Sequence, residues 1–252
     1  MIYVFLPALN EELALPIVVN KFVIELNTKK EKYQFIVFDD GSTDNMPQIV
    51  SELASMHPMI VLSHDKNQGL GQTMIDGINF LISKISDDDL IVTMDCDDTH
   101  EPKYLSAALK KIREGYDVIL LSRFQKGGGQ RGLSWFQNIL SMNAGRFLKI
   151  LFPIHGVREY SCNYRIYRGH IPKKAKKVFG EKLVRLPHMG FTVTPELLIK
   201  MRMLKAKISE SPFVLRYDKK PTISTKRTFE TIKGYFILAF LYIGHKIRLD
   251  NE

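Results

Sequence analysis

Apolar runs of strand length alternate with segments of helical periodicity through the first half of the chain. Strands are predicted at residues 2–6, 34–39, 60–63, 90–95 and 117–122. Helices are predicted between them, at about 11–26, from Asp44 or Asn45 onward, at 69–84 and at 104–113. Continuous apolar strands separated by helices indicate an α/β fold whose mostly parallel sheet is covered by helices on both faces.

The second half of the chain is less regular. The run "GGGQRG" predicts a flexible loop, residues 133–152 an amphipathic helix, 195–204 a further helix and 207–217 a strand. The basic segment 168–185 is typical of a solvated face. A last amphipathic helix is expected over 228–248, apolar at its centre and flanked by Lys233, His245, Lys246 and Arg248.

Three predicted strands end in polar clusters, which are "PALNEE", "DDGSTD" and "DCDDTH". In sheets of this kind ligands bind at the carboxyl ends of the strands. We therefore expect the three clusters to face one crevice. An acidic crevice in a basic chain favours phosphates bridged by a metal ion.

Asp95 and Asp97 are the candidate metal ligands. In extended geometry they point the same way with Cys96 between them. Two carboxylates, completed by water and phosphate oxygens, suit Mg²⁺ or Mn²⁺. A calcium loop is disfavoured because the segment lacks a mid-loop glycine, whereas a solvated turn that caps the next helix stays open as an alternative.

Other candidate residues have two interpretations each. Asp39 and Asp40 fit a turn, but a carboxylate here could also accept hydrogen bonds from a nucleobase or ribose. Arg123, just past a strand end, is either a phosphate clamp or a surface residue. The glycine run formally satisfies G-x-G-x-x-G, but five residues separate it from the strand, so it does not predict nicotinamide binding.

The chain has 36 Lys and Arg against 27 Asp and Glu, a formal charge of +9. This charge favours polyanionic partners, and the acidic crevice argues against a non-enzymatic nucleic-acid binder. Two cysteines build neither a disulfide framework nor a zinc site, which favours a reducing cytoplasmic setting. Neither a signal peptide nor a membrane-spanning segment is expected.

The motifs "PALNEE", "VFDDGSTDNM", "NQGLGQTMIDG", "MDCDDTHEP" and "SRFQKGGG", in this order, resemble the family 2 glycosyltransferases. The resemblance is closest to the polyprenyl-phosphate (dolichol-phosphate mannose synthase-like) branch. It covers about residues 1–226 and implies a GT-A fold, with a nucleotide-sugar half at 1–122 and an acceptor half at 123–226. The apolar centre and basic flanks of residues 227–252 predict a helical tail that either lies at the membrane interface or packs against the rest of the protein.

The resemblance also implies roles for single residues. Pro7, Asn10 and Glu11 would line the nucleotide pocket. Asp39 would contact the base, and Asp40 is a further candidate for binding the nucleotide. Asp95 and Asp97 would hold the metal and the diphosphate. Arg123 and the glycine loop would lie near the transferred sugar and the acceptor phosphate.

Departures from the family pattern leave the acceptor open. Gln137 stands where relatives carry an arginine, and Glu159, Asn163 and Tyr164 replace an aspartate, a glycine and a phenylalanine. For a hydroxyl acceptor, Glu159 is the candidate base, unless it forms a structural salt bridge with a neighbouring arginine. If the acceptor is a phosphate, which is already anionic, no base is needed.

The expected function is inverting, metal-dependent transfer of a sugar from a UDP- or GDP-sugar to a polyprenyl phosphate. Transfer to a hydroxyl of a glycan or protein is the alternative. The protein would lie peripherally at the cytoplasmic face of a membrane.

Overall fold

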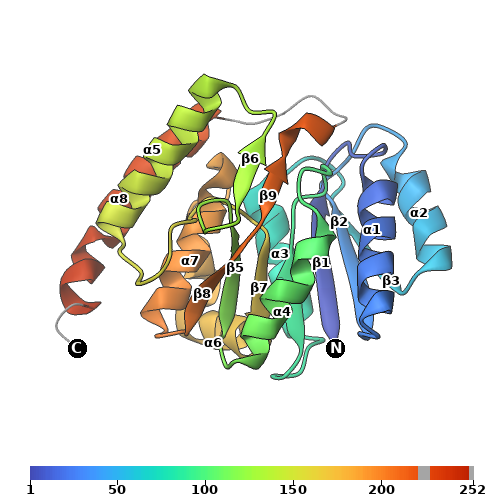
Figure 1. Cartoon of the computed structure of the whole chain (residues 1–252), viewed down its shortest axis with the longest axis horizontal. Helices are drawn as coiled ribbons and strands as arrows, with labels where there is room; N and C mark the ends of the chain where they lie inside the picture. Colours follow the sequence, from blue (N-terminus) through green and yellow to red (C-terminus); the bar gives the residue numbers. More distant parts are fainter. Residues whose placement is uncertain (221–227, 250–252) are drawn as a thin grey trace.

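The computed structural model describes residues 1–220 and 228–249, with the side chains of 136, 228 and 243–249 left aside. The predicted basic flank formed by His245, Lys246 and Arg248 lies outside the described side chains, and the expected domain boundary at 226 lies outside the described residues. Figure 1 shows one central sheet with helices on both sides and a pair of long helices at one end.

The central sheet has seven strands in the order β3-β2-β1-β4-β7-β5-β8. Their bounds are β1 Ile2–Ala8, β2 Tyr33–Asp39, β3 Met59–Ser63, β4 Leu90–Thr93, β5 Val118–Ser122, β7 Arg165–Arg168 and β8 Ile208–Pro212. Every pairing is parallel except those of β7, which runs antiparallel between β4 and β5. The mostly parallel α/β sheet expected from the sequence is therefore confirmed.

Helices cover both faces of the sheet, as predicted. On one face lie α1 Leu15–Thr28, α2 Met46–Met56 and α4 Leu105–Arg113. On the other lie α3 Leu70–Ile82, α5 Trp135–Leu151, α6 His170–Phe179, α7 Val193–Met203 and α8 Thr228–Leu249. Each face of the sheet has its own hydrophobic core, and alternate residues of a strand point into the two cores. In β1, Phe5 packs with α3, while Val4 and Leu6 pack with α1.

Several predicted elements needed correction. The first helix begins at Leu15 and not near Glu11, because residues 9–14 turn first, with Asn10 at φ 54°, and Pro16 then occupies the first helical turn. The glycine loop contains a short strand, β6 Gly129–Arg131, that pairs with β9 Val214–Arg216. The single strand predicted at 207–217 is therefore two strands in different sheets, and buried Phe213 lies between them.

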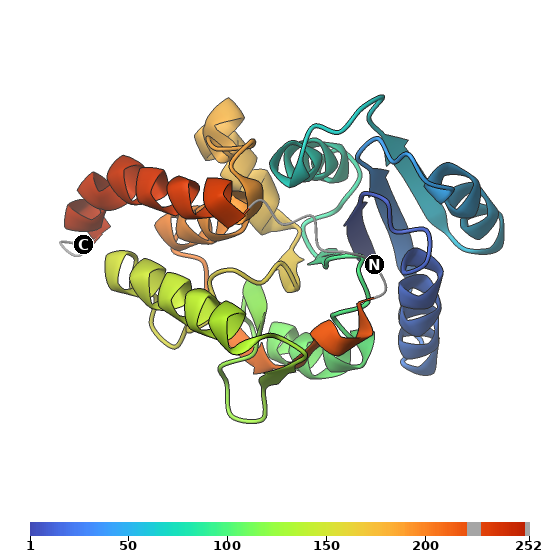
Figure 2. The same cartoon turned by 90° about the horizontal axis from the view of Figure 1, so that it is seen from above.

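The last two long helices, α5 and α8, run side by side at one end of the molecule (Figures 1 and 2). The Phe147 and Phe236 rings meet between them, with centroids 5.2 Å apart. Leu238 and Tyr235 of α8 are buried against the main body, which confirms the C-terminal helix and gives it a packed side. Among the described residues, the helices are too short or too polar to cross a bilayer.

Candidate functional site

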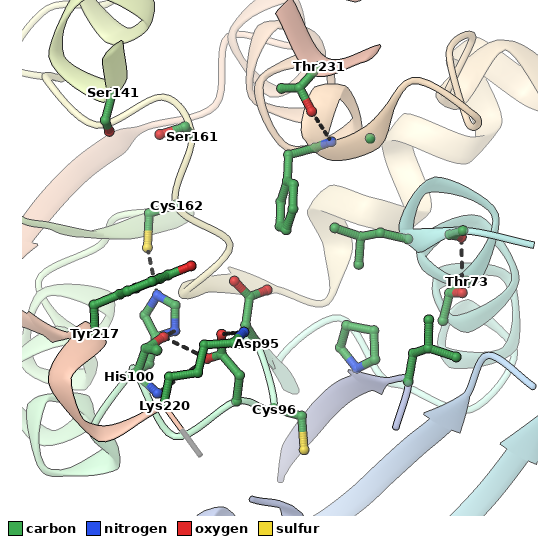
Figure 3. A pocket seen from close by; sticks show the side chains of 18 of the residues that line it. Thr73, Asp95, Cys96, His100, Ser141, Ser161, Cys162, Tyr217, Lys220 and Thr231 are labelled. Carbon is green, nitrogen blue, oxygen red and sulfur yellow. Dashed lines mark hydrogen bonds and ion pairs between the residues drawn. The ribbon is translucent and has the colours of Figure 1, made fainter. Parts of the chain in front are cut away.

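A cavity of about 570 Å³ opens at the carboxyl ends of β1, β2 and β4. The three polar clusters found in the sequence all contribute to its wall, as the parallel topology predicts. Its lining includes the predicted residues Pro7, Asn10, Glu11, Asp40, Asp95 and Asp97. Figure 3 shows this cavity, with Thr73 on one side, Asp95 at its centre and Ser141 on the other side.

The loops after β1 and β2 hold each other in place. Asn10 accepts a hydrogen bond from the Thr43 backbone N–H (2.8 Å), and its own N–H donates to Ser42 Oγ (2.9 Å). Asp44 accepts from the Glu12 N–H at 3.1 Å. Asn10 therefore shapes the pocket rim as well as lining it.

The two aspartates at the end of β2 differ in position. Asp39 Oδ1 accepts from the Ser42 N–H (2.9 Å), the turn geometry that the sequence left open, and Asp39 is not among the lining residues. Its contact with a base stays a prediction. Asp40 lines the cavity, and its carboxylate accepts from the N–H groups of Gln68 and Gly69, both at 2.8 Å. Asp40 thereby holds the loop that leads into α3.

Asp95 and Asp97 both face the cavity just past the end of β4. Asp95 Oδ1 accepts from the Asn163 amide at 3.1 Å. Asp97 Oδ1 accepts from the Thr99 hydroxyl at 2.6 Å, and Asp97 Oδ2 from Lys220 Nζ at 2.6 Å. The third acid of the run, Asp98, has φ 57° and pairs with Lys21 of α1, outside the cavity lining.

The electrostatics of the two carboxylates differ because of these partners. Desolvation and the neighbouring charge of Asp97 raise the pKa of Asp95, although His100, Asn163 and Lys220 oppose them. Desolvation also acts to raise the pKa of Asp97, but Lys220, His100 and the Thr99 hydrogen bond together outweigh it and lower that pKa. A cavity wall with two adjacent carboxylates therefore needs a nearby positive charge, which here is Lys220.

His100 also lines the cavity, close to the acidic pair, and was not singled out from the sequence. Its Nδ1 contacts Thr99 Oγ1 (3.2 Å), its Nε2 contacts Cys162 Sγ (3.4 Å), and its ring stacks on Phe213 at 5.4 Å. Burial lowers the pKa of His100. With both ring nitrogens engaged, His100 supports the acidic loop.

Arg123, at the end of β5, points into the middle of the cavity wall and pairs with Glu159. The two guanidinium–carboxylate hydrogen bonds are both 2.8 Å long. Glu159 is 1% exposed, does not line the cavity, and also accepts from the N–H groups of Ser161 and Cys162. The structure thus favours the salt-bridge alternative for Glu159 over the role of general base.

The far end of the cavity is built by α5 and α8. Gln137, Leu140, Ser141 and Ala144 come from α5, and Thr231, Ile232 and Tyr235 from α8. Gln137 also completes a capping box with Ser134 at the start of α5, so a neutral residue here has a structural role. Arg123 Nη1 reaches Ser141 Oγ at 3.3 Å.

Lys220 is a second residue of the site, besides His100, that was not predicted from the sequence. It lies 123 positions from Asp97 and belongs to a lysine-rich stretch with no distinguishing pattern. The path of the chain from β8 through β9 brings it to the cavity, where Figure 3 shows it beneath Asp95 and beside His100.

Solved structures with the same architecture include glucosyl-3-phosphoglycerate synthase from Mycobacterium tuberculosis, in complex with Mn²⁺, UDP and phosphoglyceric acid. It is 19% identical with a TM-score of 0.62, covering 96% of this chain and 78% of that one. S. aureus TarS 1–349 is 21% identical with a TM-score of 0.56, covering 85% of this chain and 60% of that one. These similarities confirm the GT-A fold.

Two curated relatives are similar in sequence. Dolichol-phosphate mannosyltransferase of Pyrococcus furiosus is 27% identical over 82% of this chain and 55% of its own length. Polyprenol monophosphomannose synthase of Mycolicibacterium smegmatis is 28% identical over 68% of this chain and 63% of its own. The chain thus spans less than two thirds of these relatives.

The family profile described as "Glycosyl transferase family 2" matches residues 3–173, which include the acidic pair, Arg123 and Glu159. This range covers more than half of the chain, including strands β2 to β7 and all of β1 except Ile2. The chain belongs to glycosyl transferase family 2.

Proposed function

We propose that this protein transfers a sugar from a nucleoside-diphosphate sugar to a polyprenyl phosphate, at the cavity between Asp95 and α5. The observation that carries the proposal is the single cavity joining the acidic strand ends to the α5–α8 pair. Relatives named for transfer to dolichol and polyprenol phosphates support this choice of acceptor.

In the proposed mechanism the donor lies along the ends of β1, β2 and β4. The loop held by Asn10 and the loop held by Asp40 would enclose the nucleoside, which would be that of a UDP- or GDP-sugar. Asp95 and Asp97 would face the diphosphate. The sugar would then point toward Arg123, next to the acceptor end of the cavity.

The two carboxylates fit a bound Mg²⁺ or Mn²⁺, because hard divalent cations prefer oxygen ligands. The described residues offer no group of three or more acidic, histidine or cysteine ligands, so phosphate oxygens of the donor would complete the shell. When bound, such an ion neutralises charge that grows on the diphosphate leaving group. Asp95 and Asp97 would hold it just past the carboxyl end of β4.

The acceptor end favours a phosphate over a hydroxyl. The carboxylates that line the described cavity are Glu11, Asp40, Asp95 and Asp97, all from the donor half. A hydroxyl acceptor needs a base beside it, whereas an anionic phosphate needs none. Glu159 is held by Arg123 and does not fill that role.

Transfer to a glycan or protein hydroxyl stays the second candidate, and one observation favours it. The charge of Arg123 is balanced by Glu159, and Gln137 is neutral, so the acceptor end is weakly cationic for a lipid phosphate. A transfer assay that compares polyprenyl phosphate with glycan acceptors separates the two candidates. Product on polyprenyl phosphate alone is expected, and product on glycans alone would refute the proposal.

A lipid acceptor implies contact with a membrane, and we place that contact on α5 and α8. Their outer sides expose Trp135 (74%), Phe236 (62%) and Phe240 (85%), while their inner sides line the cavity. An amphipathic helix with aromatic residues on its apolar side binds the interface of a bilayer. The protein would then lie peripherally at the cytoplasmic face.

Liposome flotation tests this surface. Phe240→Ser should weaken flotation, whereas Ile24→Ser on α1, an exposed apolar residue (59%) outside α5 and α8, should leave it unchanged. Equal flotation of all three proteins would place the membrane contact elsewhere.

A further inference from the structure

A short segment after β9, Tyr217–Lys220, lies across the acidic loop that follows β4; we refer to it as the strap. The strap is tied at three points. The Arg216 N–H, just before it, donates to the Thr99 carbonyl at 2.8 Å. Lys219 Nζ donates to Glu101 Oε1 at 2.7 Å, and Lys220 Nζ donates to Asp97 Oδ2 at 2.6 Å.

The two lysine contacts differ in location. Asp97 and Lys220 both line the cavity, with side chains 13% and 12% exposed. Glu101 does not line it and is shared between Lys219 and Lys103. Lys219 therefore fastens the strap outside the cavity, whereas Lys220 places an ammonium group inside it.

Both oxygens of Asp97 are engaged in this arrangement. Oδ1 accepts from the Thr99 hydroxyl and N–H, at 2.6 and 3.2 Å, and Oδ2 accepts from Lys220. A divalent cation on Oδ2 would bring two positive charges beside the ammonium, within a few ångströms and away from bulk water. The repulsion between them would be large at that distance.

We propose that Lys220 is a displaceable counter-ion of Asp97, which the divalent cation must expel from the carboxylate when it binds. This inference rests on the metal site of the proposed function. Lysine suits the role because its single ammonium on a flexible stem makes one contact that can be released without rearranging a planar group. The strap would stay fastened at Glu101 while its end moves.

The arrangement links entry of the metal to the end of the strap. While Lys220 is in place, its ammonium balances one of the two carboxylate charges of the acidic pair, that of Asp97. Once the cation replaces it, the Lys220 ammonium is released from Asp97. It then lies next to the part of the cavity in which the donor diphosphate would bind. Metal affinity is therefore lower than the two carboxylates alone would give.

The test is a titration with Mn²⁺ alone, following free Mn²⁺ by electron paramagnetic resonance with the full chain. Lys220→Met should lower the dissociation constant by about tenfold, because the competing charge is gone. Lys219→Met removes the same formal charge from the same strap and should stay within about twofold of wild type. Asp97→Asn should abolish the site.

A second readout uses the unmodified chain and needs no variant to fold. Acetylation of lysines, followed by mass spectrometry, should speed up at Lys220 when Mn²⁺ is added and stay constant at Lys219. Unchanged acetylation at Lys220 would overturn the displacement.

The outcomes separate this inference from the proposed function. If Lys220→Met and wild type bind Mn²⁺ equally, or if Lys219→Met tightens binding as much as Lys220→Met, the counter-ion role is wrong while the metal site stands. If wild type and Asp97→Asn bind Mn²⁺ alike, the metal site is wrong, and the counter-ion role is wrong with it.

Discussion

Arg123 and Glu159 form a two-pronged ion pair, with Nε donating to Oε2 and Nη2 to Oε1, both at 2.8 Å. Their side chains are only 8% and 1% exposed. Burial acts to raise the pKa of Glu159, but Arg123 outweighs it and lowers that pKa, so the carboxylate stays charged. The pair joins the end of β5 to the segment before β7 and fixes the guanidinium in the cavity wall.

Replacement of Glu159 by Gln should destabilise the protein, because it leaves a buried guanidinium without its counter-charge. The expected loss is about 3–5 kcal/mol in the free energy of unfolding, measured by urea denaturation. The double variant Arg123→Met, Glu159→Leu should lose less than the sum of the two single changes. A Glu159→Gln protein as stable as wild type but inactive would instead point to a base.

His64 gives stability a pH dependence. It lies between Asp40 (Nδ1–Oδ1 2.8 Å) and Asp76 (Nε2–Oδ2 3.1 Å), with its ring on Phe38. Burial lowers the pKa of His64, but the two carboxylates outweigh it and raise that pKa. A raised folded-state pKa stabilises the fold below the unfolded value, about 6.5, and this contribution disappears as the pH rises through the folded value.

The unfolding free energy of wild type minus that of His64→Gln should therefore be larger at pH 5 than at pH 8.5. Urea denaturation at a series of pH values measures it. If the difference in unfolding free energy is constant, or grows with rising pH, a charged His64 between Asp40 and Asp76 does not stabilise the fold.

Tyr242 anchors α8 to α7 through Glu196. The Tyr242 hydroxyl donates to Glu196 Oε1 at 2.8 Å, and this carboxylate, 0% exposed, also accepts from the Arg185 N–H at 2.9 Å. Tyr242→Phe removes a hydrogen bond to a charged acceptor, so about 1.5–3 kcal/mol should be lost. Phe240→Ser, at an 85% exposed site two residues away, should leave urea denaturation unchanged. Equal effects would show that α8 is not anchored there.

The regular strands and helices could be predicted because the sheet is buried on both faces and its strands are continuous apolar runs. Strand β7 was missed because "RIYR" carries two arginines. The Arg165 side chain, 1% exposed, donates to the carbonyls of Tyr160, Cys162 and Thr194, so a charged residue occupies the core. The burial of Arg165 depends on tertiary contacts, so it cannot be predicted from a hydropathy pattern.

The donor side of the site was predictable for a topological reason, since parallel strands bring their carboxyl ends to one edge. The acidic residues of "PALNEE", "DDGSTD" and "DCDDTH" could therefore be grouped before any contact was known. Lys220 and the Arg123–Glu159 pair could not, because they depend on how β6, β9 and the segment before β7 fold back. The topology does not say which way each side chain points. Asp39 ends a strand at this edge, but its side chain accepts a hydrogen bond within the turn and is not part of the cavity lining.

The central claim is that Asp95 and Asp97 hold the metal and the diphosphate during sugar transfer. The most direct test measures transfer from UDP- and GDP-sugars to a polyprenyl phosphate, with and without Mg²⁺ or Mn²⁺. Asp97→Ala is compared with Asp98→Ala, its neighbour outside the cavity lining, and thermal unfolding checks that both variants fold.

Wild type and Asp98→Ala should transfer the sugar only when the divalent cation is present. Asp97→Ala should fold and lose about 10²–10³-fold of that activity, because the charge developing on the leaving group is no longer stabilised. Normal, metal-dependent transfer by Asp97→Ala would contradict the account.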